Sequence, residues 1–360
     1  MISENASSAT SDQSIVPQPY FDRDGIVMYQ GDCRLMLKHL PEQSVNTCVT
    51  SPPYWGLRDY GHDDQIGQET SPQEFVEAMV SLFREVRRVL KDDGTVWLNL
   101  GDSYCPVNRG ENARPRKETL VGISAGNPHS DLPTRKTTIQ AVKAMGIKPK
   151  DLCGIPWRVA LALQADGWWL RQDIIWHKPN PMPESVTDRC TKSHEYIFLL
   201  SKSERYYFNC EAIKEDAVCG ANGSDFHTGK TGEHQLGRSQ KVRPSKPKGS
   251  FNGKTEAMAA TGQNAFRAVT EKRNKRSVWS VTLKPYKGAH FATYPQELIE
   301  PCILAGCPEG GTVLDPFIGS GTTAAVARRS GCKFVGFELN PEYLALAEKR
   351  FVQGALQFVG

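Results

Sequence analysis

Six consecutive residues that follow a strand-like run carry the most specific chemical signal in this chain. Residues 50–55 read Thr-Ser-Pro-Pro-Tyr-Trp. Proline fixes φ and has no N–H, so Pro52 and Pro53 hold an extended turn that no helix absorbs. This turn offers an acceptor hydroxyl on Ser51, the bare carbonyl of Pro52 and the aromatic face of Tyr54. The set suits a planar substrate with an exocyclic amino group, although a plain Pro-Pro turn at a strand end is the alternative.

A glycine-rich segment near the C-terminus is the second signal. Residues 311–323 read Gly-Thr-Val-Leu-Asp-Pro-Phe-Ile-Gly-Ser-Gly-Thr-Thr, which predicts a strand into Asp315, a turn and then a helix. Glycines let the backbone pass close to a ligand and supply N–H groups at a helix N-terminus. The spacing is neither the dinucleotide fingerprint nor a phosphate-binding P-loop. The next predicted strand, at 334–337, ends in Glu338, where an acid is placed to accept ribose hydroxyls.

Together the two segments resemble the amino-group DNA methyltransferases that use S-adenosylmethionine. The 50–54 turn precedes the 315–323 segment, which resembles the circularly permuted beta class. The resemblance covers about residues 26–205 and 288–360. It implies an α/β, Rossmann-like S-adenosylmethionine-dependent methyltransferase fold, circularly permuted, with helices on both faces of a mixed sheet and an inserted DNA-recognition region.

The resemblance also implies three sets of site residues. The catalytic set is Ser51, Pro52, Pro53 and Tyr54. The cofactor-binding set is Asp32, Thr293, Pro295, Asp315, Phe317, Gly319, Gly321, Thr322, Glu338 and Asn340. The set facing the target base or DNA is Trp55, Lys178 and Asn180. Asp315 and the glycine loop would hold the amino-acid moiety of the cofactor and Glu338 its ribose.

Two of these sets keep a simpler alternative. Asp32 would lie near the adenine of the cofactor, but an Asp at this position can equally cap the next helix. Lys178 and Asn180 follow the strand predicted at 168–176, where they would reach the flipped base or a phosphate. An ordinary proline-rich turn is the alternative there.

The predicted chemistry is methyl transfer to the N4 of cytosine in duplex DNA. The amino lone pair is delocalised into the ring, so the Ser51 hydroxyl and the Pro52 carbonyl would each bind one amino hydrogen and turn the lone pair out of the plane. The base must first be flipped out and stacked, here on Tyr54. Ser-Pro-Pro-Tyr resembles the cytosine-N4 enzymes more than the adenine-N6 enzymes, which usually carry Asp or Asn before the two prolines. Adenine-N6 stays open, because some adenine enzymes also carry Ser.

Three further functions fit less well. Cytosine-C5 methylation needs a Cys nucleophile after a Pro, and Pro301-Cys302 falls within the helix predicted at 296–305. Protein-glutamine methylation uses a related Asn-Pro-Pro-Tyr turn, without the permuted order or a basic insert. A non-catalytic DNA-binding protein with this fold is the more remote alternative, which the intact motifs disfavour.

The charge of the chain is unevenly distributed. The net charge is only +4, but Phe226–Lys287 holds 14 Lys and Arg against 3 Glu. That segment therefore carries +11 and the rest of the chain −7. A basic module beside an acidic domain is typical of a polyanion partner. The same Gly-, Ser- and Asn-rich composition would also suit a disordered linker.

Composition and charge together define the predicted organisation. We expect a disordered arm without a secretory signal at 1–24 and the catalytic half at 25–205, in which 105–150 is a mobile loop that could contact DNA. The basic target-recognition region is expected at 206–287 and the cofactor-binding half at 288–360. No apolar stretch approaches the roughly 20 residues that span a bilayer. The ten cysteines show no metal-ligand spacing, which indicates reduced thiols in a cytoplasmic protein.

The partners implied are S-adenosylmethionine and double-stranded DNA, with no membrane and no metal. A bacterial, archaeal or phage origin fits such a DNA-associated enzyme. A cognate restriction endonuclease and a homodimer stay open.

The remaining pattern predicts scaffold. Residues 71–74, Ser-Pro-Gln-Glu, form a capping box with Pro at the first helical position. Apolar residues every three to four positions predict a helix that Gly94 stops. Strands are predicted at 25–30, 95–100 and 196–201, the last as an edge hairpin partner, and a helix at 156–166.

Overall fold

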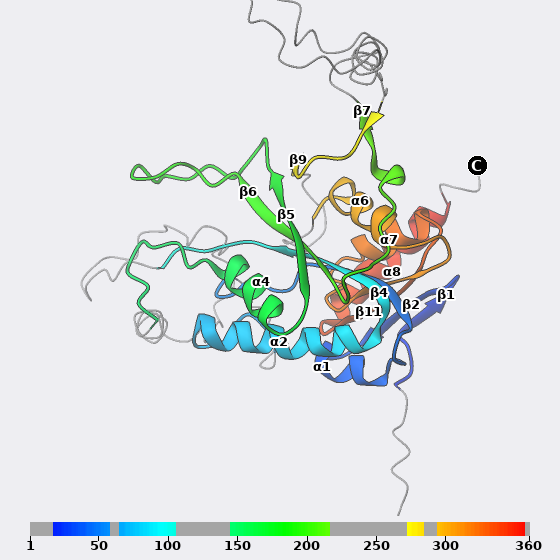
Figure 1. The fold of residues 1–360 in the computed structure, drawn as a ribbon. Coiled ribbons are helices and arrows are strands. Elements are labelled where there is room, and N and C mark those ends of the chain that lie inside the picture. Colours follow the sequence, from blue (N-terminus) through cyan, green and yellow to red (C-terminus); the bar gives the residue numbers. More distant parts are fainter. Residues whose placement is uncertain (1–16, 58–64, 106–144, 217–271, 284–293, 357–360) are drawn as a thin grey trace, which may run out of the picture. The chain divides into compact units, whose positions relative to one another are not determined.

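The computed structural model describes residues 17–57, 65–105, 145–216, 272–283 and 294–356 (Figure 1). The chain divides into two units: 1–212 with 276–360, and 213–275. The described part of the second unit contains an antiparallel pair, β7 (Glu215–Asp216) with β8 (Lys272–Arg273). The short helix η2 (Glu211–Ile213) spans the boundary between the units in sequence. Most of the predicted N-terminal arm, the 105–150 loop and the basic region lies outside the described residues.

Within its described residues, the larger unit is built on a nine-stranded sheet in the order β1-β2-β11-β10-β3-β4-β6-β5-β9. The strands are β1 (Phe21–Arg23), β2 (Ile26–Gln30), β3 (Val45–Thr50), β4 (Leu90–Leu100), β5 (Trp169–His177), β6 (His194–Ser201), β9 (Val278–Ser280), β10 (Thr312–Asp315) and β11 (Lys333–Glu338). Strands β2, β11, β10, β3 and β4 are parallel, whereas β6 is antiparallel to both β4 and β5. The carboxyl ends of the parallel strands and the start of β6 therefore meet at one edge.

Helices cover both faces of this sheet (Figure 1). One group is α1 (Cys33–Met36), η1 (Leu37–His39), α2 (Pro72–Val89) and α4 (Ile155–Ala165). The other is α6 (Gln296–Gly306), α7 (Thr322–Arg329) and α8 (Pro341–Leu356). Strand β4 shows the two faces: Leu98 belongs to the core under α2 and α4, whereas Trp97 faces α6. A Cβ on Gly306 of α6 would lie 2.6 Å from Trp97 Nε1, so only glycine fits there.

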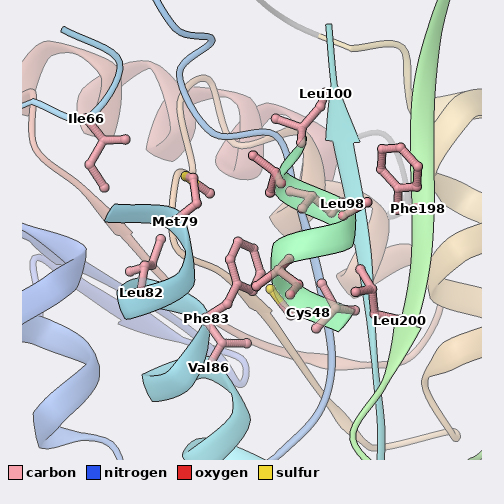
Figure 2. Close-up of a cluster of buried hydrophobic side chains, with 14 of the residues drawn as sticks. Cys48, Ile66, Met79, Leu82, Phe83, Val86, Leu98, Leu100, Phe198 and Leu200 are labelled. Carbon is pink, nitrogen blue, oxygen red and sulfur yellow. The ribbon is translucent and has the colours of Figure 1, made fainter. Parts of the chain in front are cut away.

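The main apolar core lies between α2, α4 and the sheet. Figure 2 shows Met79, Phe83 and Val86 of α2 on one side of this cluster and Leu98 of β4 and Phe198 of β6 on the other. These side chains are fully buried, and burial of each is worth about 1.5–3 kcal/mol. The three α2 residues are three to four positions apart, which confirms the predicted apolar face of the helix. Through this face α2 packs on the sheet.

The capping box is confirmed with one change. Ser71 Oγ accepts the N–H of Glu74 at 3.2 Å, as predicted, but the Glu74 carboxylate accepts the N–H of Thr70 instead of that of Ser71. Pro72 occupies the first turn of α2. The start of this helix is therefore encoded locally in the sequence.

Two scaffold predictions are wrong. Helix α2 ends at Val89 and not at Gly94, because Leu90 turns to extended backbone and pairs with Val45 of β3. Strand β6 is not an edge strand, because it lies between β4 and β5. Its run Ile-Phe-Leu-Leu at 197–200 is buried throughout, which is typical of a strand covered on both faces.

No helix in the described ranges is both long and apolar enough to cross a membrane.

Candidate active site

The two predicted motifs lie side by side at the carboxyl edge of the parallel strands. Strand β3 leads into the 51–54 turn, and its neighbour β10 leads into the glycine loop. The Thr50 hydroxyl donates to Asp315 Oδ1 at 2.7 Å, which joins the end of β3 to the end of β10. Segments 265 positions apart in sequence are thus held in direct contact.

Asp315 is the centre of a buried hydrogen-bond cluster. Its Oδ1 accepts from Thr50 and from the Phe317 N–H at 3.0 Å, while its Oδ2 accepts from the hydroxyls of Thr323 at 2.5 Å and Tyr294 at 3.2 Å. Burial raises the pKa of the carboxyl, and the four donors oppose that shift. Both oxygens are engaged by the protein, so the structure does not support direct contact between Asp315 and the cofactor. The carboxylate orders the loop from beneath.

The glycine loop leads into the buried start of helix α7. Gly319 (φ +53°) donates its N–H to Glu338 Oε2 at 2.8 Å. Gly321 (φ +78°) precedes the first turn of α7, and no side chain caps the helix there. A Cβ on Gly321 would lie 2.8 Å from Cβ of Ala347, so two independent constraints require glycine. An uncapped helix N-terminus is suited to a carboxylate such as that of a methionine moiety.

Glu338 ends β11 beside this loop. Its Oε2 accepts from Gly319 and its Oε1 accepts the N–H of Asn340 at 2.9 Å. Burial raises the pKa of the Glu338 carboxyl. Each oxygen has a further lone pair, so the group can still accept from a ligand hydroxyl. Asn340 instead caps α8, because its Oδ1 accepts the N–H of Glu342 at 2.8 Å.

Asp32 lies after β2, the strand next to β11. The Gly31 N–H donates to the Glu338 carbonyl at 2.9 Å, which brings this turn to the same edge. Asp32 Oδ1 accepts the N–H of Arg34 at 2.8 Å and its carboxylate pairs with the Arg34 guanidinium. The helix-capping alternative is therefore confirmed, and the contact with adenine stays a prediction.

Two other predicted cofactor residues, Pro295 and Thr322, make contacts within the protein, and their contacts with the cofactor stay predictions. Pro295 precedes α6 and its carbonyl accepts from Leu298 at 3.1 Å. The Thr322 hydroxyl accepts from the guanidinium of Arg350 at 2.8 Å. Thr293 lies outside the described residues.

The predicted catalytic turn at 51–54 is held by polar contacts and by close packing. Ser51 Oγ donates to the Tyr54 hydroxyl at 3.4 Å. The Tyr54 hydroxyl donates to Glu195 Oε2 at 2.8 Å and lies 3.1 Å from Asn99 Oδ1. A Cβ on Gly101 would lie 2.5 Å from Cε2 of Tyr54, so the ring rests directly on the backbone after β4. The orientation of the ring is thus fixed by the bonds of its hydroxyl and by its packing on Gly101.

The residues predicted to face the target base bind within the protein. The Lys178 ammonium pairs with Glu195 Oε1 and lies 4.3 Å from the ring centroid of Trp176. The Asn180 side chain donates to the Leu283 carbonyl at 3.1 Å and accepts the Leu283 N–H at 2.9 Å. Contacts of either side chain with DNA stay predictions.

Trp55 is a core residue in this structure. It is 4% exposed, and its Nε1–H donates to the Glu69 carbonyl at 2.9 Å. The next N–H, of Gly56, donates to Gly67 at 2.8 Å, so the chain after the catalytic turn is tied to 67–69. This placement does not support the predicted contact of Trp55 with DNA.

Several polar residues of the site were missed from the sequence. Asp102, which follows β4, accepts the N–H groups of Gly154 and Ile155 and so caps α4, and burial raises its pKa. Lys192 donates to the Asp102 carbonyl at 2.8 Å, and burial lowers its pKa. Asn99 is an amide within the buried second half of β4, where its neighbours are mostly apolar. Nothing local distinguished Glu195.

Two further observations bear on the site. Pro301 and Cys302 lie inside α6 as predicted, and Cys302 is fully buried, so neither resembles an exposed nucleophile. Where the chain is described, no group of three or more His, Cys, Asp or Glu side chains is placed to hold a metal ion.

Comparison with known proteins agrees with this arrangement. The family model described as DNA methylase matches residues 45–349. The Type II methyltransferase M.Cfr9I of Citrobacter freundii is 43% identical over 350 residues, which cover 97% of this chain and 95% of that protein.

Two solved structures share the fold. The PvuII DNA methyltransferase (cytosine-N4-specific) superposes with a TM-score of 0.56 at 19% identity, covering 93% of this chain and 89% of that one. The putative DNA modification methylase TTHA0409 of Thermus thermophilus, solved with S-adenosyl-L-methionine, has a TM-score of 0.51 at 22% identity and covers 91% and 93%. With a family match over most of its length and so similar a relative, this chain belongs to the DNA methylase family of N6 and N4 methyltransferases.

Proposed function

We propose that this Type II DNA methyltransferase transfers a methyl group to the N4 of cytosine at a specific site in duplex DNA, after the base is flipped out. The observation that carries the proposal is the Thr50–Asp315 hydrogen bond of 2.7 Å. It holds a turn with two amino-hydrogen acceptors beside a loop suited to the cofactor. The cytosine assignment is supported by Ser51 in the turn and by the likeness to a fold whose PvuII member is named cytosine-N4-specific.

S-adenosylmethionine is the cofactor, and the residues at the edge of the sheet fit it. The uncapped start of α7 suits its carboxylate, and Glu338 retains acceptor capacity for the ribose hydroxyls. When bound, the cofactor supplies an activated methyl group. Asp315 contributes by fixing the loop and not by touching the ligand.

The protein contributes alignment and hydrogen-bond acceptors. The Ser51 hydroxyl and the Pro52 carbonyl each accept one hydrogen of the target amino group, which directs the nitrogen lone pair out of the ring plane. Tyr54, fixed against Gly101, supplies the face on which the flipped base stacks. Such alignment of reacting groups can lower a barrier by several kcal/mol.

DNA is held, in this proposal, by the basic region at 206–287 together with 105–150. Phosphate contacts from Lys and Arg give affinity, and side chains that reach base edges give site specificity. In a Type II system a cognate restriction endonuclease would share the same recognition site.

The test is to incubate the protein with labelled S-adenosylmethionine and plasmid DNA, digest the DNA to nucleosides and identify the modified base. N4-methylcytosine is expected. N6-methyladenine alone would refute the cytosine assignment and establish the adenine reaction. Absence of label in DNA, with cofactor binding intact, would refute DNA methylation on the plasmid sites present.

A further inference from the structure

A chain of polar groups ties the catalytic turn to the hairpin formed by β5 and β6. Ser51 Oγ donates to the Tyr54 hydroxyl, which donates to Glu195 Oε2 at 2.8 Å. The other Glu195 oxygen pairs with the ammonium of Lys178. The side chains of Glu195 and Lys178 are only 17% and 15% exposed. Ser51 and Tyr54 contact the target base in the proposed methyl transfer, whereas Glu195 and Lys178 do not.

The carboxylate at the end of this chain determines the direction of every hydrogen bond in it. An ionised carboxylate only accepts, whereas a hydroxyl both donates and accepts. The Tyr54 hydroxyl therefore donates its single hydrogen to Glu195, and its oxygen accepts a hydrogen bond from Ser51. Because Ser51 donates its hydrogen to Tyr54, the lone pairs of Ser51 Oγ are available to accept a hydrogen from the target amino group.

We propose that Glu195 is a positioning residue for methyl transfer, acting through Tyr54 to hold Ser51 as an acceptor. This inference rests on the proposed function, which assigns Ser51 and Tyr54 to the target base. Without the carboxylate, Tyr54 can donate to Asn99 Oδ1 or turn its proton toward Ser51. If Tyr54 donates to Ser51, the Ser51 hydroxyl hydrogen points toward the target amino group. Ser51 then no longer presents an acceptor to the amino hydrogen.

Lys178 supports Glu195 in this role. A carboxylate of such low exposure needs an opposite charge nearby, because removing an isolated charge from water is strongly unfavourable. Lys178 supplies that charge and is itself held over the ring of Trp176. The ion pair therefore assigns Lys178 to the support of Glu195 instead of to a DNA phosphate.

The experiment uses the full chain, S-adenosylmethionine and a duplex that carries the site methylated by the wild type. Glu195→Gln should lower kcat by about tenfold or more, the scale of one charge-assisted hydrogen bond, with cofactor affinity within about twofold. Tyr54→Phe should also lower kcat, and adding Glu195→Gln to it should cause no further loss. That non-additivity is expected only if Glu195 acts through the Tyr54 hydroxyl.

A matched control lies on the same hairpin. Glu184 is 5% exposed and pairs with Arg189 at 2.6 Å. Glu184→Gln should leave kcat within about twofold of wild type, and the melting temperatures of both Gln variants show whether each is folded. Lys178→Met should reproduce the kcat loss of Glu195→Gln.

Three results would overturn the inference. One is a wild-type kcat in folded Glu195→Gln; another is a loss that adds in full to that of Tyr54→Phe. The third is a Lys178→Met variant with unchanged kcat, a higher KM for DNA and a smaller salt dependence, as a phosphate contact predicts. Each of these requires an active wild type, whereas failure of the proposed function would appear as a wild type that methylates no DNA.

Discussion

Replacement of Glu338 by alanine tests the cofactor site most directly. The carboxylate accepts the N–H groups of Gly319 and Asn340 and, in the proposed complex, a ribose hydroxyl. Loss of one hydrogen bond to a charged group costs about 1.5–3 kcal/mol. The Kd for S-adenosylmethionine should therefore rise by about 10- to 150-fold. Isothermal titration calorimetry on the free protein measures this directly.

The same substitution should destabilise the free protein. Two backbone N–H groups lose their acceptor, at about 1–3 kcal/mol for each that stays buried and unpaired. Glu338→Gln keeps the size of the side chain and one acceptor oxygen, so it should fall between wild type and Glu338→Ala in both stability and affinity. Urea denaturation of the three proteins separates the structural effect from the loss of the ligand contact.

The pH dependence of S-adenosylmethionine binding is a second test of the role of Glu338. Burial raises the pKa of Glu338 above its ordinary value of 4.5, so the group protonates at a higher pH than an exposed glutamate does. A protonated carboxyl is the weaker acceptor, and affinity should fall as the pH is lowered through the raised pKa. The Gln variant should lack this fall. A folded Glu338→Ala protein with wild-type Kd would refute the assignment.

Three further predictions concern turnover and DNA. Ser51→Ala should lower kcat by about 100-fold, as for other groups that bind best in the transition state, with little change in cofactor affinity by calorimetry; an unchanged kcat would remove Ser51 from the reaction. Gly101→Ala should displace the Tyr54 ring, reduce stability by about 1–3 kcal/mol and slow methyl transfer, because its Cβ would lie 2.5 Å from the ring; thermal melting and rate assays check this. Deletion of 217–271 should abolish site-specific DNA binding and its salt dependence but not cofactor binding, and methylation of the same sites by the truncated chain would move recognition to 105–150.

The position of the site was predictable because its motifs end strands that are parallel. Ser51 follows β3, Asp315 ends β10 and Glu338 ends β11, and the carboxyl ends of such strands share one edge. Local pattern was enough to predict these ends. It was also enough for the start of α2, where Ser71 and Pro72 act within one turn.

The partners of the site residues were not predictable, since they depend on contacts between distant segments. Glu195 lies 141 positions from Tyr54, and no pattern around it differs from an ordinary strand start. The place of β6 inside the sheet follows from its pairing with β4, which no local propensity encodes. The burial of Asp315 and Trp55 is likewise a tertiary property, which the sequence around them does not show.

The order of strands in the sheet sets a condition on biosynthesis. Strands β2 and β3 are translated early, yet β11 and β10, translated last, lie between them. Until residues 312–338 have left the ribosome, both early strands keep an open edge toward a gap two strands wide. Open edges of this kind pair readily with other chains. Nascent or prematurely terminated chains are therefore expected to depend on chaperones, and completion of the sheet coincides with completion of the cofactor site.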